Sequence, residues 1–232
     1  MSHPDNVRPT GISLTIAQTF SNNGAKVYTA GPHADVLEET TRVWGRALLH
    51  PHGQLASIEN LRVNTLVNNA RGSLGTSEVE KRDSGGGGAT ELREELWRED
   101  LADWESVYRT NVIGYFFTAA AFLPLLSAAA RGGHTGTVIN ISSMLGITRT
   151  TQHHFKDNVS KAATIDLTTL LAQEFCRPTA TRLLSRARRR ASRRGQPGKE
   201  EDMAQTVLFS ACYEYAYGQI VAAEGGYLLE HP

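Results

Sequence analysis

Cysteine is nearly absent from this chain of 232 residues, which holds only Cys176 and Cys212. Two isolated cysteines cannot build a disulfide framework, and their spacing fits no metal-ligand pattern. We therefore predict no metal site, and we expect a reducing intracellular compartment.

Long apolar runs are also missing. The longest, Tyr115 to Ala130, is interrupted by Thr118, Pro124 and Ser127 and is shorter than the roughly 20 residues that span a bilayer. The chain does not open with a basic segment followed by an apolar stretch, so no secretory signal is visible. We interpret the apolar run as a buried helix, and we expect a cytoplasmic protein without a membrane partner.

Net charge is absent as well, because 24 Lys and Arg balance 24 Asp and Glu, but the arginines are unevenly distributed. The arginine-rich segment 177–194 contains eight arginines and no acidic residue, which leaves the rest of the chain at about −8. Clustered guanidinium groups attract phosphates. The segment lacks the interleaved aromatic residues of a base-stacking surface, so we expect no nucleic-acid partner.

Two further interpretations of the arginine-rich segment 177–194 stay open beside a nucleic-acid or nuclear-import signal. The segment can form a solvated basic helix. It can also be the product of a shifted or unspliced reading frame, because GC-rich codons read out of frame yield Arg, Ala and Pro.

Apolar residues make up 40% of the chain and charged residues 21%, which is typical of one soluble globular α/β domain spanning 1–232. Residues 72–90, which contain four consecutive glycines, are predicted to form a flexible loop. Helices and strands alternate along the sequence without internal repeats. The predicted helices are 10–20, 34–44, 91–130 with breaks near Trp104 and Pro124, 157–175 and 200–211, and the predicted strands are 25–30, 62–67, 137–141 and 219–221. This alternation predicts a doubly wound, mainly parallel sheet with ligands at the carboxyl ends of its strands.

The most informative stretch runs from Val138 to Lys161. A strand-like segment delivers Ser142 and Ser143, and Asp157 precedes Lys161 by one helical turn. This layout places a hydroxyl at a strand end opposite a lysine on the following helix. The group one turn before the lysine should carry the chemistry, and here it is an aspartate.

Short motifs in a fixed order resemble those of the short-chain dehydrogenase/reductases, especially fungal members of secondary metabolism. The matching pieces are Thr10-Gly11-Ile12, Gly24-Ala25-Lys26-Val27, Asn68-Asn69-Ala70, Asn111-Val112-Ile113-Gly114, Ile141-Ser142-Ser143, Ser160-Lys161-Ala162-Ala163, Gly195-Gln196-Pro197 and Gly225-Gly226. They span nearly the whole chain. The resemblance implies an NADP- or NAD-dependent oxidoreductase that interconverts a small-molecule carbonyl and a secondary alcohol, in a biosynthetic pathway.

The resemblance also implies roles for the catalytic residues. Ser143 would hydrogen-bond the substrate carbonyl, Lys161 would hold the nicotinamide ribose, and Asn111 would position a water that relays the proton. The family's tyrosine stands four residues before the lysine, and Asp157 takes its place here. An aspartate is ionised at neutral pH, and a carboxylate opposes negative charge that develops on a nearby carbonyl oxygen.

Two interpretations of Asp157 are open. It can form an ordinary ion pair with Lys161 near a helix start, or burial can retune it into an acid. His153 and His154 lie close in sequence and are alternative proton donors.

On the cofactor side, the resemblance assigns Gly11, Ile12 and Asn69, together with Lys161, to nucleotide binding. Arg71 replaces the glycine that follows Asn-Asn-Ala in the family. Its side chain is expected to obstruct the nicotinamide side of the cleft rather than to bind a phosphate.

The family's phosphate loop carries three glycines, and if Gly11 is the second, the first falls on Val7 and the third on Ser13. The Ser13 side chain is expected to intrude on close packing between helix and strand. We therefore predict a weakened anion site.

Two strands of the family fold are expected to be missing, which predicts an incomplete Rossmann-like parallel sheet flanked by helices. Residues 1–6 are too few and too polar for the first strand, and the arginine-rich segment 177–194 stands in place of the sixth. The strands 25–30 and 65–67 would then each leave an unpaired edge, at ~1–3 kcal/mol per buried unsatisfied backbone group. Either they pair with each other, or another chain supplies a strand, or the fold is damaged.

Two functional hypotheses follow from these departures. The first is an active oxidoreductase, and the second is a catalytically impaired pseudoenzyme or eroded gene product that pairs with an intact homologue. The helices at 101–129 and 157–176 correspond to those through which family members form oligomers, so a homo- or hetero-oligomer is expected in either case.

Overall fold

The computed structural model describes residues 11–31, 47–49, 62–71, 88–130, 135–148, 154–179, 181–188 and 198–229. Its strands are β1 (Val27–Thr29), β2 (Ala47–Leu49), β3 (Thr65–Asn68), β4 (Gly136–Ile141), β5 (Thr181–Arg188) and β6 (Gln219–Ala223). Its α-helices are α1 (Ile12–Asn22), α3 (Ala89–Trp97), α4 (Leu101–Tyr108), α5 (Gly114–Ala130), α6 (Phe155–Thr179) and α7 (Glu200–Cys212). Short helices of other types are η3 (Arg109–Ile113), η4 (Met144–Gly146) and η5 (Tyr227–Leu229).

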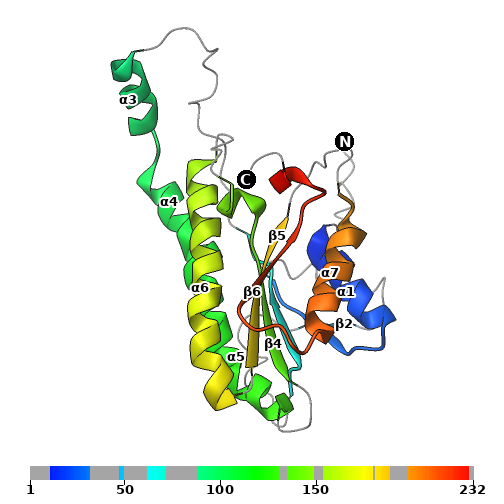
Figure 1. The fold of residues 1–232 in the computed structure, drawn as a ribbon. Helices are drawn as coiled ribbons and strands as arrows, with labels where there is room; N and C mark the ends of the chain where they lie inside the picture. Colours follow the sequence, from blue (N-terminus) through cyan, green and yellow to red (C-terminus); the bar gives the residue numbers. More distant parts are fainter. Residues whose placement is uncertain are drawn as a thin grey trace, which may run out of the picture.

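The strands form two parallel sheets, one of β1 and β2 and one in the order β3-β4-β5-β6. Helices α1 and α7 cover one face of the larger sheet, and α5 and α6 cover the other (Figure 1). This arrangement is the Rossmann-like α/β architecture that the alternation of elements predicted.

Strand β4 is buried along its whole length and separates two apolar clusters. Ile139 faces α1 and α7, where it packs with Ile16 and Val207, whereas Val138 faces the cluster of α5 and α6 that contains Leu126. Successive side chains of a strand point to opposite faces, so one short apolar segment serves both layers. The predicted elements 137–141, 157–175, 200–211 and 219–221 are confirmed as β4, α6, α7 and β6.

The arginine-rich segment contains a strand, contrary to prediction. Strand β5 lies between β4 and β6, with Gly136 aligned to Thr181 and with Arg186 aligned to both Ile141 and Val221. The expectation that the sixth family strand is missing is therefore wrong, and so is the interpretation of 181–188 as a basic helix. Charged residues are depleted in central strands, but strand pairing is made by the backbone, which arginine can supply.

The first family strand remains a prediction, because residues 1–6 lie outside the described residues. Strand β1 pairs with β2 and not with β3, so the alternative in which the segments 25–30 and 65–67 pair with each other is wrong. Strand β2 has only three residues, too few for a periodic signal, and the sequence did not predict it. The predicted helix 34–44 and residues 72–87 of the predicted loop also lie outside the described part of the chain.

Helix α1 begins beside a glycine. Gly11 is the N-cap, with a φ of 100° that side chains rarely adopt. At the other end, the Ala25 amide donates to the Phe20 carbonyl at 3.0 Å around Gly24, whose φ is 85°. These two glycines set where the helix begins and ends, and the chain then enters β1.

The helical region 91–130 is broken at places other than those predicted. The Asp100 side chain accepts a hydrogen bond from the Ala102 amide at 2.9 Å and starts α4 there, and no break occurs near Trp104. Pro124 lies inside α5. The irregular turn is instead the π-helix η3, and such turns are frequent at functional sites.

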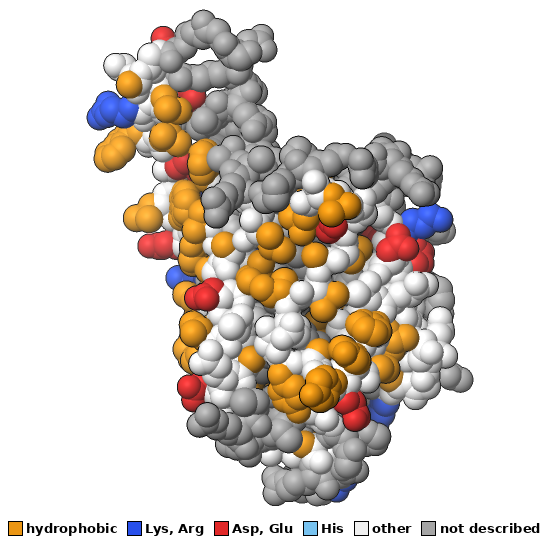
Figure 2. Space-filling view, viewed as in Figure 1, with side chains coloured by type: hydrophobic (Ala, Val, Ile, Leu, Met, Phe, Trp, Pro, Cys, Tyr) orange, Lys and Arg blue, Asp and Glu red, His pale blue; other side chains and the backbone are white. Residues whose placement is uncertain are grey.

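Helix α5 was expected to be buried, but it is buried along one stripe only. Ala119 and Leu126 are fully buried, whereas Phe116 and Phe117 are 41% and 63% exposed. Figure 2 shows hydrophobic side chains gathered along the edge formed by α3, α4 and α6. The stretch Leu101–Ala130 has the length and composition of a membrane span, although soluble core helices pass the same test. Association through these helices stays a prediction, for which the exposed phenyl rings offer a surface.

Candidate active site

The strand end after β4 and the start of α6 are brought into backbone contact. A Cβ added at Gly146 would lie 2.6 Å from the Lys161 carbonyl carbon, so only glycine allows η4 to approach α6 this closely. Ser142 Oγ donates to the Lys161 carbonyl at 2.8 Å. Ser143 caps η4, where its Oγ accepts from the Leu145 amide at 3.2 Å. The strand end that carries Ser142 and Ser143 therefore lies against the lysine-bearing helix, and the roles of Ser143 and Lys161 stay predictions.

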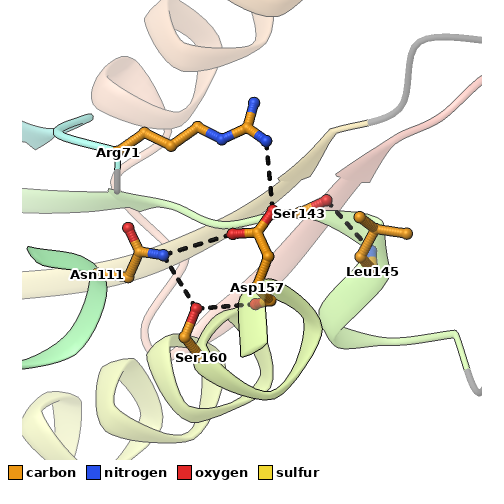
Figure 3. Close-up of polar contacts among 6 residues, drawn as sticks. All are labelled: Arg71, Asn111, Ser143, Leu145, Asp157 and Ser160. Carbon is orange, nitrogen blue, oxygen red and sulfur yellow. Dashed lines mark hydrogen bonds and ion pairs between the residues drawn. The ribbon is translucent and has the colours of Figure 1, made fainter. Parts of the chain in front are cut away.

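Asp157 lies in the first turn of α6 and is 4% exposed. Its Oδ2 lies 3.3 Å from Arg71 Nη2, and its Oδ1 accepts from Asn111 Nδ2 at 3.5 Å (Figure 3). Among the described residues, the ion pair of Asp157 is with Arg71 and not with Lys161. The expected pairing with Lys161 is thus wrong, because the guanidinium reaches the carboxylate from the end of β3.

Asn111, on η3, is fully buried and connects the same carboxylate residue to the next turn of α6. Its Nδ2 donates to Ser160 Oγ at 2.9 Å, and Ser160 Oγ donates to the Asp157 carbonyl at 2.8 Å. The Asn111 carbonyl accepts from Thr164 Oγ1 at 2.8 Å. Sequence reasoning missed Ser160, although its position three residues after Asp157 places both on one helix face.

A second row of polar side chains continues this cluster into the sheet. Asn68 Nδ2 donates to Asn140 Oδ1 at 2.9 Å, and Asn140 Nδ2 donates to Thr168 Oγ1 at 2.9 Å. Thr168 Oγ1 donates to the Thr164 carbonyl at 2.7 Å. Buried polar groups are costly unless they are paired, so this chain fixes β3, β4 and α6 in one arrangement.

Lys161 is 4% exposed and lies within electrostatic range of both charges of the ion pair. Burial lowers its pKa from 10.5 to about 8, because desolvation disfavours the ammonium. The Asp157 carboxylate raises this pKa, and the Arg71 guanidinium lowers it. Lys161 therefore remains a cation at neutral pH, but it gives up its proton far more readily than an exposed lysine.

Tyr115 is the phenol beside the lysine, with its ring centre 6.0 Å from Lys161 Nζ. Its hydroxyl donates to the Ala70 carbonyl at 2.8 Å and lies 3.3 Å from the Ile141 carbonyl. Burial raises the pKa of Tyr115. This phenol joins the ends of β3 and β4, and its hydroxyl is turned to the backbone, so it does not substitute for the family's tyrosine.

The structure describes only one of the two histidines that were predicted as alternative proton donors. His153 lies outside the described residues. The His154 carbonyl accepts from the Asn158 amide at 2.8 Å, and in the described part of the chain no contact joins its ring to the carboxylate of Asp157.

The N-terminus of α1 lies beside the carboxyl end of β3, where Asn69 Nδ2 donates to Ser13 Oγ at 2.6 Å. Ser13 is exposed, and the first family strand, against which its intrusion was expected, lies outside the described residues, so that expectation stays a prediction. Among the described residues nothing lies within 4 Å of a Cβ added at Gly11, and Thr15 Oγ1 donates to Glu200 Oε2 at 2.9 Å. The first amides of a helix lack intrahelical partners and attract anions, so these residues fit the pyrophosphate of a dinucleotide. Val7 lies outside the described residues.

A parallel sheet with helices on both faces, and a helix N-terminus beside a strand's carboxyl end, define a Rossmann-like α/β protein. Residues 9–179 match the family described as short chain dehydrogenase, and the chain belongs to this family of oxidoreductases.

Similar proteins have the same family name. Short-chain dehydrogenase/reductase PhomF of Diaporthe leptostromiformis is 29% identical over 96% of this chain and 89% of its own. The rhamnolipids biosynthesis 3-oxoacyl-(acyl-carrier-protein) reductase of Pseudomonas aeruginosa is 27% identical over 71% of this chain and 63% of its own. Among solved structures, the Pseudomonas aeruginosa RhlG/NADP active-site complex has a TM-score of 0.78 and 25% identity, with 94% of this chain and 93% of that chain covered. The resemblance drawn from the motifs is confirmed.

Proposed function

We propose that this protein interconverts a small-molecule ketone and a secondary alcohol with NADP or NAD, in a biosynthetic pathway. The observation that carries the proposal is the contact between the strand end that carries Ser142 and Ser143 and the helix that carries Lys161, beside the polar cluster of Asn111. A solved relative is described as a complex with NADP, and another relative is named for a biosynthetic reductase, which supports both parts.

The cofactor would be held along the carboxyl ends of the strands. Gly11 and Ile12 begin α1, where the helix dipole and the first backbone amides favour a pyrophosphate. Asn69, already bonded to Ser13, borders the same edge, and Lys161 would contribute from α6. When bound, the cofactor supplies or accepts a hydride.

The chain's own residues would orient the substrate and move its proton. The Ser143 hydroxyl would hydrogen-bond the substrate carbonyl. Asn111 would hold the neighbouring side chains of α6 in place through its hydrogen bonds. Asp157 does not give a proton, because both carboxylate oxygens face donors. Lys161 is the buried acid with a proton to transfer.

Fluorescence titration with NADPH tests the proposal. We expect a saturable change for the native protein and at least about tenfold weaker binding for Ser13→Asp, which places a negative charge at the start of α1. Gln205→Asp, at an exposed position on α7, is the matched control and should bind as the native protein does. No saturation by the native protein would contradict the proposal and favour a pseudoenzyme that pairs with an intact homologue.

A further inference from the structure

The contact between Arg71 and Asp157 joins two positions at which this chain departs from its family's pattern. Arg71 stands in place of a glycine, and Asp157 stands in place of the tyrosine. They are 86 residues apart in sequence, and Arg71 Nη2 lies 3.3 Å from Asp157 Oδ2. Because the two unusual residues meet, each determines what the other can do.

The Asp157 carboxylate acts as an anchor. Its side chain is 5% exposed, with one oxygen toward Arg71 and the other toward Asn111 (Figure 3). A buried carboxylate is stable only when it is paired, and a guanidinium is the partner best suited to it. The ion pair therefore holds the end of the Arg71 side chain at the place where the family has a phenol.

Arg71 does not simply obstruct the cleft, because its guanidinium is held by Asp157. Its side chain is 53% exposed, so it connects the buried carboxylate to the open side of the site. A guanidinium is always charged, and Nη2 of Arg71 contacts Asp157. This geometry brings a permanent positive charge to the Asp157 carboxylate on a side chain that reaches solvent.

Lys161 adds a second cation to the same cluster. Arg71 lowers its pKa and Asp157 raises it, so all three charges interact, with a net charge of +1 while the lysine is protonated. Preorganised positive charge in a buried site stabilises an oxygen on which negative charge develops. The cluster is thus complementary to the product of hydride transfer to a carbonyl.

We propose that Arg71, held by Asp157, binds and stabilises the substrate oxygen in place of the family's phenol. The proposal rests on the proposed function. In the reduction, the carbonyl carbon receives a hydride from the reduced nicotinamide, and the π electron pair of the C=O bond moves to the oxygen. The oxygen takes a proton from the Lys161 ammonium, and the resulting amine recovers a proton from water. Arg71 is then a catalytic residue, and Asp157 is a positioning residue.

Arg71→Gly separates this role from obstruction, because it restores the family's residue and removes the guanidinium. With NADPH and ethyl acetoacetate as the ketone probe, we expect kcat to fall by about 100-fold. NADPH affinity should stay within about twofold, and millimolar guanidinium chloride should restore part of the rate. The control, Arg98→Gly at an exposed position, should keep native activity. Unchanged or increased kcat in Arg71→Gly would overturn the proposal.

Acetate binding without cofactor gives a second readout, measured by saturation-transfer NMR. Acetate carries its charge on oxygen, so we expect it to bind the native protein and to be lost from Arg71→Gly. Asp157→Asn removes a negative charge, so it should bind acetate at least as well while its kcat falls about tenfold with little change in KM. Equal acetate binding by the native protein and Arg71→Gly would refute the role of Arg71.

The outcomes distinguish the two proposals. If the native protein shows no saturable NADPH binding, the proposed function fails and this role of Arg71 fails with it. If the native protein binds NADPH and reduces the ketone while Arg71→Gly is equally active, the proposed function stands and only the role of Arg71 is lost.

Discussion

The two sheets differ in how they are connected to the rest of the molecule. The larger sheet contains β4, whose six residues are all buried and whose Asn140 bonds to both β3 and α6. In the smaller sheet, the three residues of β1 are only partly buried, and Thr29 Oγ1 is buried without a hydrogen-bond partner among the described residues. The candidate active site therefore lies on the well-connected sheet.

This difference indicates that departures from the family's motifs near α1 leave the hydrogen bonds of the larger sheet in place. The hydrogen bonds of Asn68, Asn140 and Thr168 do not involve α1, β1 or β2. Regions with fewer buried contacts open at lower free energy, so the two sheets should differ in local stability. The following substitutions test this.

The largest effect is expected from Asn140→Ala. The change removes two buried hydrogen bonds and leaves the side chains of Asn68 and Thr168 without these partners, so the free energy of unfolding should fall by about 3 kcal/mol. Denaturant unfolding measures it. Asn23→Ala, which removes an exposed hydrogen bond to Thr19 beside the smaller sheet, is the matched control and should cost less than about 1 kcal/mol. Equal losses of unfolding free energy in the two variants would contradict the difference in local stability between the two sheets.

A smaller effect is expected from Gly146→Ala, because the added methyl meets the backbone of Lys161 at 2.6 Å. Forced separation of η4 and α6 should cost about 2 kcal/mol and lower activity by displacing Ser143. Within the described part of the chain, Gly11→Ala meets nothing within 4 Å and suffers from its strained backbone conformation, so it should cost about 1 kcal/mol. If the Gly11 variant were the less stable of the two, the packing of η4 against α6 would not be the tighter constraint.

The smallest effect on the free energy of unfolding is expected from Lys161→Met. Unlike the substitutions above, it should stabilise the protein. Burial gives Lys161 a pKa of about 8, below its value in the unfolded chain, so the buried ammonium destabilises the fold at pH 7. The variant should be more stable by roughly 1 kcal/mol at pH 7 while losing reductase activity.

The pH dependence provides the check on this sign. Between about pH 8 and 10.5 the unfolded chain keeps a proton on Lys161 that the folded protein has lost, so native stability rises relative to the variant. Parallel unfolding curves at pH 7 and pH 9.5 should show the advantage of Lys161→Met shrinking. An advantage that grows with pH would mean that the lysine is held as a stabilising cation.

The sequence predicted the parts of the site that depend on local spacing. Ser143 follows a buried strand, and Lys161 lies one helical turn after Asp157, so the strand and helix periods place them. The contact between Arg71 and Asp157 spans 86 residues and depends on tertiary packing, which no local pattern encodes. For the same reason the sequence suggested an ion pair between Asp157 and Lys161, the lysine nearest to it on the same helix face.

Strand β5 shows the other limit of local reasoning. Its composition, rich in arginine, argued against a buried strand, yet the backbone of Arg186 aligns with strands on both sides. Propensity is a weak prior that pairing on two edges overrides. The π-helix η3 was missed because one extra residue in a turn leaves no mark on apolar periodicity, although it determines where Asn111 lies.

The hydrogen bond from Thr15 to Glu200 has a consequence for synthesis of the chain, because its partners are 185 residues apart. Helix α1 leaves the ribosome well before α7, against which its apolar face packs. Contacts of such sequence separation form late, after most of the loop entropy has been lost. The contact between α1 and α7 is therefore completed only after α7 has been synthesised, and until then the apolar face of α1 is exposed to aggregation.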